Sequence, residues 1–179
     1  MKVKDEEITS YAGYAGGIAR DNVCYHNPTN FKDYAQYGHA EVVALTIPNA
    51  YYPKFADEYV KLFDKNGDRP DKLDRGPEYR HMVGLPGGVK SPLFPQLEEA
   101  VKPLGVTLRE GQGSDPDNLG KKSIWVYDTQ QFPFYKGELY HQYHDGFMPG
   151  ENYPDSYNGL RDKARADGRI DKTGCPDMK

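Results

Sequence analysis

Cysteine and long apolar segments are both scarce in this sequence. Its 179 residues include two cysteines, Cys24 and Cys175, which are too few for the disulfide framework of a small secreted domain and lack a metal-ligand spacing such as CxxC. We therefore expect any thiol chemistry to use isolated cysteines. No run approaches the ~18 apolar residues of a membrane span, and residues 1–10 lack the apolar stretch of a secretory signal. These absences predict a soluble chain with no membrane span.

A large excess of acidic or basic residues is also lacking. The net charge of -4 comes from 27 acidic and 23 basic residues spread along the chain, so no strong field would attract a polyanion. Nucleic acid is therefore not an expected partner. Tyrosine, by contrast, is abundant, with 15 Tyr against 7 Phe and 1 Trp. A tyrosine can bury its ring while its hydroxyl stays hydrogen-bonded, which favours a wet cleft or a contact surface.

Short apolar segments separated by glycine and proline predict a single α+β or α/β domain. Strands are predicted at 8–18, 39–47, 79–85 and 121–127, and helices at 52–64 and 91–101. The segment between the second helix and the last strand is rich in loop formers and predicts one weak strand at most. From Tyr140 onward the chain is polar and rich in Gly, Pro and Asp. Any order there must come from docking on the rest of the domain.

Five motifs in a fixed order carry more information than any of them alone. They are GYAGG at 13–17, NPT at 27–29, GHAEVV at 38–43, DRGPEYR at 74–80 and FYKGELYHQYH at 134–144. GYAGG does not have the spacing of a phosphate-binding or dinucleotide-binding loop. In order and spacing the five motifs resemble those of the peptide methionine sulfoxide reductase A family. The similarity runs from about Val3 to Leu160, and an insertion near 103–120 indicates a divergent branch.

The resemblance implies a fold. It predicts an α+β two-layer sandwich over residues 1–160, with a ferredoxin-like core and a mixed sheet packed by helices, and a C-terminal tail over 161–179. Family members carry a GCFW motif on a strand and helix upstream of GYAGG, whereas residues 1–12 contain neither Cys nor Trp. We therefore expect the N-terminal strand and helix to be missing or supplied from elsewhere, by an extension or by a protein partner.

The resemblance also implies a chemistry. In the family the GCFW cysteine attacks the sulfoxide sulfur, releases methionine and becomes a sulfenic acid, which a second thiol resolves as a disulfide. The implied activity is thiol-dependent reduction of methionine S-sulfoxide, free or in peptides, with no cofactor and with an external reductant such as thioredoxin. A reducing compartment, such as the cytosol or an organelle matrix or stroma, would suit it. Because the nucleophile is not in this chain, the alternative is a non-catalytic member serving as a binding or structural subunit of an assembly.

Three polar residues match the family's supporting groups. Glu41 matches the glutamate that hydrogen-bonds and protonates the sulfoxide oxygen, and burial would raise its pKa for that role. Asp74 and Tyr79 match the aspartate and tyrosine that orient the site and donate a hydrogen bond to the same oxygen. Outside these motifs, a strand-edge carboxylate and a core tyrosine would be ordinary structural residues.

A further tyrosine that the family places soon after NPT is not conserved in its usual position here. Phe31 is the nearest candidate, and Tyr34 can substitute for it if the loop is shifted. Both residues are candidates for substrate binding. His39 lies beside the glutamate motif, but we assign it a structural role, hydrogen-bonding a neighbouring backbone group.

The two cysteines remain open to more than one interpretation. Cys24 could be a relocated nucleophile, but no neighbour in sequence marks an activated thiolate, so a small structural cysteine is favoured. Cys175 resembles the distal resolving cysteine of a mobile tail and could equally be a free tail thiol, while Asn158 occupies the place of another family cysteine. The pair His141 and His144 lacks a third ligand motif, so no metal is expected.

Overall fold

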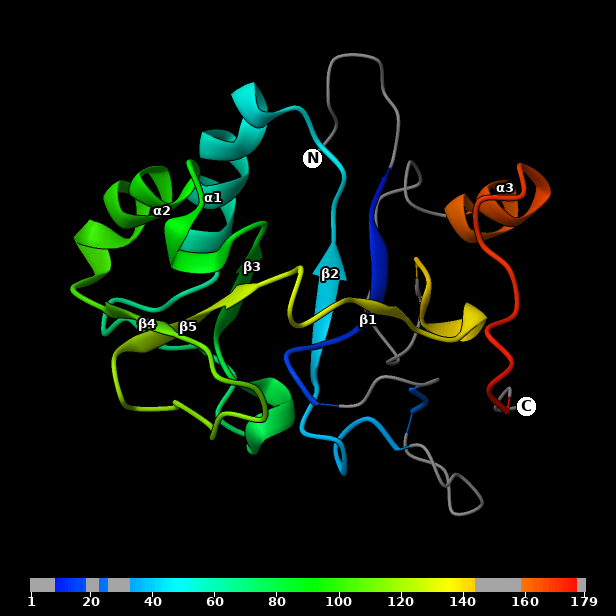
Figure 1. Ribbon diagram of the computed structural model, residues 1–179, viewed down its shortest axis with the longest axis horizontal. Helices are drawn as coiled ribbons and strands as arrows, with labels where there is room; N and C mark the ends of the chain where they lie inside the picture. The colour runs from blue at the N-terminus through cyan, green and yellow to red at the C-terminus, as the bar shows by residue number, and fades with distance from the viewer. Residues whose placement is uncertain (1–8, 19–22, 26–32, 144–158, 177–179) are drawn as a thin grey trace.

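The computed structural model describes residues 9–18, 23–25, 33–143 and 159–176 (Figure 1). Two sheets of three strands each are formed in this part of the chain. The first has the order β2-β1-β6, with β1 at Tyr11–Ala15, β2 at Ala40–Ala44 and β6 at Tyr135–Lys136. The second has the order β3-β5-β4, with β3 at Met82–Leu85, β4 at Thr107–Glu110 and β5 at Ser123–Asp128. The helices are α1 at Tyr52–Val60, α2 at Phe94–Val101 and α3 at Leu160–Ala166, so the domain is α+β as predicted.

The GYAGG motif forms the centre of the first sheet, where β1 pairs antiparallel with both β2 and β6. Glycine is required at position 13 because a Cβ there would lie 2.1 Å from the backbone oxygen of Tyr135. Gly16 then turns the chain with a φ of 80°, which other residues rarely adopt. The register sets Tyr14 opposite Glu41, so the strand pairing itself positions the predicted catalytic carboxylate.

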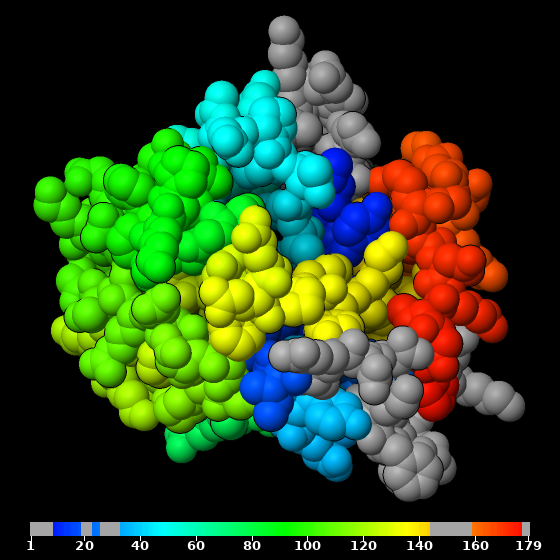
Figure 2. Space-filling model, in the orientation of Figure 1, coloured from blue at the N-terminus to red at the C-terminus, as the bar shows by residue number. Residues whose placement is uncertain are grey.

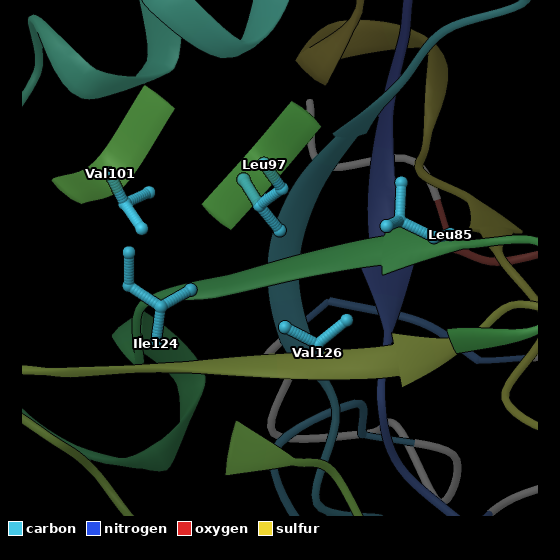
Figure 3. Close-up of a cluster of buried hydrophobic side chains, with 5 residues drawn as sticks. All are labelled: Leu85, Leu97, Val101, Ile124 and Val126. Carbon is cyan, nitrogen blue, oxygen red and sulfur yellow. The ribbon is translucent and has the colours of Figure 1, made fainter. Parts of the chain in front are cut away.

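The second sheet is parallel and holds the main apolar core. Leu97 and Val101 of α2 point toward Leu85, Ile124 and Val126 of the strands (Figure 3). Each of these side chains is nearly inaccessible to solvent, and burying one such group contributes roughly 1.5–3 kcal/mol. Pro95 suits the first turn of α2, where a missing backbone N–H costs nothing.

The predicted elements at 8–18, 39–47, 52–64, 91–101 and 121–127 are present with shorter bounds, and the weak strand is β4. The expected strand at 79–85 begins only at Met82, because Gly76 and Pro77 start a 3-10 turn that runs through Tyr79. The expected mixed sheet is not formed by the described residues. All antiparallel pairs lie in one sheet and all parallel pairs in the other. None of the helices in the described ranges is both long and apolar enough to cross a bilayer.

The C-terminal residues pack along one side of the antiparallel sheet, orange to red beside yellow in Figure 2. Ala164 and Ile170 are buried against Tyr143, and Lys136 donates a hydrogen bond to the backbone oxygen of Arg169. The order of this segment therefore comes from docking, as its composition predicts. Residues 177–179 of the predicted tail lie outside the described residues.

A disulfide joins Cys24 to Cys175, with the two Cα atoms 5.7 Å apart across a sequence separation of 151 residues. The prediction that the cysteines act as isolated thiols is therefore wrong for this structure. Spacing gave no signal because the bond depends on tertiary docking of the tail. Closing so long a loop restricts the unfolded chain, an effect of about 4–5 kcal/mol in the chain-entropy description.

Candidate active site

A carboxylate and three tyrosines gather where β2 passes the loop before it. The hydroxyl of Tyr34 donates a hydrogen bond to Oε1 of Glu41 at 2.8 Å. Tyr34 is fully buried, and its ring stacks on Tyr14 with 4.6 Å between centroids. Its backbone N–H donates to the oxygen of Cys24 at 2.8 Å, which fixes the loop against the neighbouring segment. Burial and the nearby Glu41 raise the pKa of Tyr34, so its hydroxyl keeps its proton.

Tyr79 approaches the same carboxylate from the 3-10 turn Pro77–Tyr79, which packs beside β2. Burial, followed by the charges of Glu41 and Asp74, raises the pKa of Tyr79 to about 12. The phenol is therefore a proton donor at neutral pH. The turn is held by Arg69, whose Nη1 donates to the backbone oxygen of Tyr79 at 2.9 Å, while its Nε and Nη2 donate to the backbone oxygen of Asp74 at 3.0 and 2.7 Å.

Tyr25 is a member of the site that sequence reasoning missed. Its ring stacks on Tyr34 with 5.8 Å between centroids, and burial followed by the charge of Glu41 raises its pKa. The abundance of tyrosine was the only available signal, and it does not single out this position. Glu41, Tyr25, Tyr34, Tyr79 and Asp74 are called the Glu41 cluster below.

The structure brings together Glu41, Tyr34 and Tyr79, while Asp74 lies on an exposed segment near enough for its charge to act on Tyr79. Phe31, the other substrate-binding candidate, lies outside the described residues, as does the NPT motif. One expectation about Glu41 is not met. The residue is exposed rather than buried, because it faces an open groove.

Arg80 and His39 hydrogen-bond the backbone segments that carry the site. Nη2 of Arg80 donates to the backbone oxygens of Gly16 and Gly38, both at 3.0 Å, and its Nε donates to the hydroxyl of Tyr127 at 2.9 Å. This buried guanidinium thus ties GYAGG and GHAE to the parallel sheet. Nδ1 of His39 accepts a hydrogen bond from the backbone N–H of Gly17 at 3.1 Å. Burial, and then Arg80, lower the pKa of His39 to about 4, so it is a neutral, structural residue.

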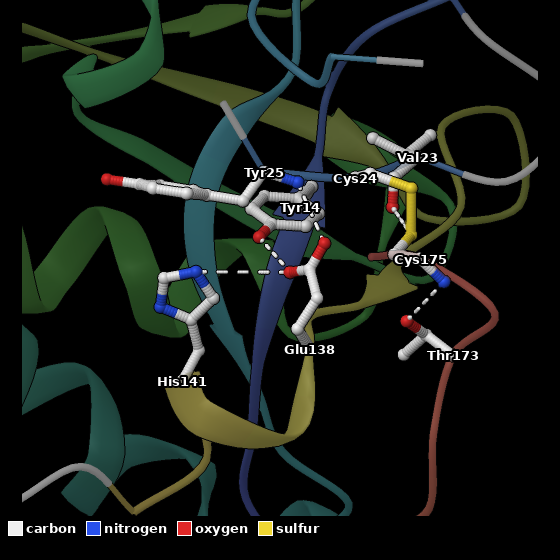
Figure 4. Close-up of a disulfide and its surroundings, with 8 residues drawn as sticks. All are labelled: Tyr14, Val23, Cys24, Tyr25, Glu138, His141, Thr173 and Cys175. Atoms are coloured by element: carbon white, nitrogen blue, oxygen red, sulfur yellow. Dashed lines mark hydrogen bonds and ion pairs between the residues drawn. A yellow bond between two sulfur atoms is a disulfide. The ribbon is translucent and has the colours of Figure 1, made fainter. Parts of the chain in front are cut away.

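A second polar centre surrounds Glu138, which Figure 4 shows between His141 and the disulfide. The buried carboxylate accepts hydrogen bonds from the Tyr14 hydroxyl at 2.6 Å and from the Tyr25 backbone at 2.8 Å. Because Tyr25 also stacks on Tyr34, this centre is connected to the Glu41 cluster through Tyr25. Glu138 belongs to the FYKGELYHQYH motif, but its role was not predicted.

The cysteines lie beside Glu138, and the ligand atoms of Cys24, Cys175 and Glu138 are all within 4.8 Å of one another. Both sulfurs are used by the disulfide, so in this state they are not thiolate ligands. Cys175 is therefore neither a free tail thiol nor an available resolving thiol here, and Cys24 is not an available nucleophile. His144, the partner of His141 in the sequence pair, lies outside the described residues.

The groove in front of Glu41 has a volume of about 1230 Å³ and is lined by residues of β1, β2, α1 and β3. The largely apolar wall also carries acidic, basic and histidine side chains, namely Glu41, Glu58, Arg69, Arg80, His81 and His141. No protein-family model, curated protein or solved structure matches the chain.

Proposed function

We propose that this chain is a peptide methionine sulfoxide reductase A-type domain, with the reductase A-like fold, that binds methionine S-sulfoxide, free or in peptides, for thiol-dependent reduction. The supporting observation is the convergence of a carboxyl group and protonated phenols on one position. The hydroxyl of Tyr34 donates a hydrogen bond to Glu41, and the charge of the same carboxylate raises the pKa of Tyr79. A sulfoxide oxygen needs hydrogen-bond donors and a proton as its bond to sulfur breaks.

The reaction consumes two thiols. A thiolate attacks the sulfoxide sulfur while Glu41, protonated once bound substrate removes its carboxyl group from water, transfers a proton to the oxygen. The thioether leaves, and the oxygen remains on the attacking sulfur as a sulfenic acid. A second thiol attacks that sulfur to form the disulfide, and the oxygen departs as water. Tyr34 and Tyr79 donate hydrogen bonds to the oxygen while charge on it changes. No cofactor is required, because the electrons come from thiols.

The attacking thiolate comes from outside this sequence, in an extension or in another molecule, because its two cysteines, Cys24 and Cys175, are joined to each other. In this proposal Cys175 becomes a resolving thiol only after the disulfide is reduced, and a thioredoxin-like dithiol is the candidate reductant. The opening of Glu41 to the groove fits a site that is incomplete without a further segment.

The same observation favours a second candidate, a non-catalytic subunit of a larger assembly. The Glu41 cluster would then serve as a binding site or as a support for a partner. The two candidates differ in whether the cluster recognises a sulfoxide, so binding of the small molecule separates them.

The test is titration of the purified chain with N-acetyl-methionine amide S-sulfoxide, followed by NMR, with the R-sulfoxide in a parallel titration. We expect selective binding of the S form, weakened about tenfold by Glu41→Ala and by Tyr34→Phe, since each removes one hydrogen-bonding group worth ~1–2 kcal/mol. Glu110→Ala, which removes an exposed carboxylate at the end of β4, is the matched control and should bind like the wild type. Equal binding of both diastereomers, or indifference to the two cluster variants, would reject the proposed function.

A further inference from the structure

Three side chains that can bind a metal ion meet beside the disulfide, although they come from distant parts of the sequence. The sulfurs of Cys24 and Cys175 and a carboxylate oxygen of Glu138 all lie within 4.8 Å of one another. Cys24 follows β1, Glu138 follows β6, and Cys175 belongs to the C-terminal segment. Within the residues that the structure describes, no other three His, Cys, Asp or Glu side chains gather in this way. Two sulfurs and one oxygen are donors that suit zinc, whereas calcium and magnesium prefer oxygen alone.

Glu138 is already oriented and still has the capacity to bind an ion. The residue is 1% exposed. Its Oε2 accepts a hydrogen bond from the Tyr14 hydroxyl at 2.6 Å, and its Oε1 accepts one from the Tyr25 backbone N–H at 2.8 Å. Each oxygen of a carboxylate can accept from two directions, so these bonds fix the group without using all of its lone pairs.

Glu138 also has little counter-charge close to it. In the described part of the chain its one ion-pair partner is His141, whose Nε2 lies 3.9 Å from Oε2. A carboxylate that is removed from water is costly unless a cation compensates for it. Figure 4 shows His141 on one side of the carboxylate and the disulfide on the other. A cation bound by the two sulfurs would supply positive charge on the side that His141 does not occupy.

Reduction of the disulfide turns this arrangement into one that favours a cation. A dithiol reductant supplies two electrons and two protons, the S–S bond breaks, and Cys24 and Cys175 become thiols. If both thiols ionised beside Glu138, three negative charges would lie close together, and like charges at short range disfavour one another. A zinc ion removes this conflict, because it displaces the two thiol protons and binds both thiolates.

The backbone around both cysteines is held by hydrogen bonds that reduction does not break. The backbone oxygen of Cys24 accepts from the Tyr34 N–H at 2.8 Å, and the N–H of Cys175 donates to Oγ1 of Thr173 at 3.3 Å. Two Zn–S bonds of about 2.3 Å at a tetrahedral angle put the sulfurs roughly 3.8 Å apart. Side-chain rotation provides that separation with the two Cα atoms at the observed 5.7 Å. Cys175 is half-buried, so an ion can enter from its side.

We propose that Cys24, Cys175 and Glu138 form a zinc site when the disulfide is reduced, and that formation of the disulfide expels the ion. Both sulfurs and one oxygen of Glu138 bind the zinc, and water takes the fourth position of the tetrahedron. Tyr14 and His141 orient the carboxylate from outside the coordination sphere. When an external disulfide takes two electrons from the thiolates, the S–S bond forms again and Zn²⁺ is released. The ion and the disulfide are thus alternative cross-links between the C-terminal segment and the rest of the domain.

The test uses the full 179-residue chain in two redox states. One sample is reduced with a phosphine, which is then removed without exposure to air, and the other stays oxidised. Each is titrated with Co²⁺, whose thiolate complexes show charge-transfer absorption, and then with Zn²⁺ in competition with a chromophoric chelator. We expect the reduced chain to bind one ion per chain, with a cobalt–thiolate band that zinc abolishes. The oxidised chain should bind at least ~100-fold more weakly, because it has no thiolate to offer.

A matched pair of variants tests the carboxylate ligand. Glu138→Gln keeps the shape of the side chain and an acceptor oxygen but loses the charge, so the zinc affinity of the reduced protein should fall at least ~tenfold. Glu110→Gln changes an exposed residue of β4 and should bind zinc like the wild type. The double variant Cys24→Ser/Cys175→Ser should show no cobalt–thiolate band.

A stability measurement on the wild type does not depend on how well any variant folds. An ion that binds the folded chain raises its stability, whereas an ion that binds a disordered dithiol does not. We therefore expect zinc to raise the urea midpoint of the reduced protein and to leave that of the oxidised protein unchanged.

Four outcomes would overturn the proposal. They are no metal binding by the reduced wild type, one ion shared by two chains, equal zinc affinity of Glu138→Gln and Glu110→Gln, and a urea midpoint of the reduced protein that zinc does not raise. Equal binding by the oxidised chain would overturn it as well, because the site would then not need thiolates. Since these assays contain no sulfoxide and leave Glu41 unchanged, their results are independent of the sulfoxide-binding test.

Discussion

The hydroxyl of Tyr34 donates to Oε1 of Glu41 across a 2.8 Å hydrogen bond, and this contact links a fully buried ring to an exposed carboxylate. The tyrosine is held by stacking on Tyr14 and Tyr25, so its hydroxyl is fixed before any ligand arrives. Glu41 in turn is held by the register of β1 and β2. The site is thus preorganised on its buried side and open on the other.

Tyr34→Phe tests the structural worth of this contact. The ring and its stacking are kept and only the hydroxyl is lost. A hydrogen bond to a charged group contributes up to ~3 kcal/mol when shielded, and solvent at Glu41 reduces that, so we expect the free energy of unfolding to fall by about 1 kcal/mol. Urea denaturation measures the change. Tyr51→Phe, on the turn Asn49–Tyr51, is the control, and its free energy of unfolding should fall by less. A loss equal to that of the control would mean that the Tyr34 hydroxyl adds nothing to stability.

Reduction of the disulfide should loosen the C-terminal tail more than the sheets. The bond closes a loop with a sequence separation of 151 residues, and losing such a cross-link costs about 4–5 kcal/mol in the chain-entropy description. We expect amides of 159–176 to lose exchange protection first, because fewer apolar contacts hold them. Urea midpoints and amide hydrogen exchange are measured with and without a phosphine reductant.

The double variant Cys24→Ser/Cys175→Ser provides the control for that comparison. It should match the reduced protein in stability and show no response to reductant. If the wild type is as stable reduced as oxidised, the cross-link contributes nothing to this fold.

Local patterns predicted most of the elements. The helix Phe94–Val101 follows from its proline entry and apolar spacing, and β5 follows from a compact β-branched and aromatic run. The close crossing at Gly13 also fits its glycine-rich motif. These features depend on neighbours in sequence, so a sequence contains them directly.

Long-range relations were not predictable in the same way. The Cys24–Cys175 bond and the support of Tyr25 by Glu138 join segments more than a hundred residues apart, and neither residue spacing nor periodicity encodes them. The exposure of Glu41 was missed for a related reason. The run HAEVVALTI predicts a strand but does not say which of its residues face a groove, and here Glu41 lines one.

Acid should destabilise the protein through His39. Its folded pKa is about 4, below the ordinary histidine value of 6.5, because of burial and Arg80. The unfolded chain therefore binds more protons between these values, and stability present above pH 6.5 is lost as pH falls toward 4. The full shift corresponds to about 3 kcal/mol at most. Burial also lowers the pKa of His81, which adds a loss in the same direction.

His39→Asn isolates the contribution of this residue, since an amide oxygen can still accept from the Gly17 backbone without titrating. We expect the variant to lose less stability than the wild type between pH 6.5 and 4, with the remaining slope assigned to His81 and the carboxylates. Parallel pH profiles for the two proteins would show that His39 is not charged on unfolding in this range.

The 179-residue chain is not expected to reduce methionine sulfoxide by itself. Glu41, Tyr34 and Tyr79 can polarise a sulfoxide bond, but polar groups cannot form the sulfur–sulfur intermediate that reduction requires. Cys24 is 4% exposed and is joined to Cys175 beside Glu138, so it offers no thiolate to a substrate in the groove. We therefore expect the purified 179-residue chain to reduce neither diastereomer of dabsyl-methionine sulfoxide. The assay is run under oxidising conditions and again after the disulfide has been reduced and the reductant removed. Turnover of the S-sulfoxide by the reduced wild type, abolished by Cys24→Ser and retained by Cys175→Ser, would contradict the prediction and identify Cys24 as the nucleophile. Activity that survives both substitutions would instead mean that the chemistry does not use a cysteine of this chain.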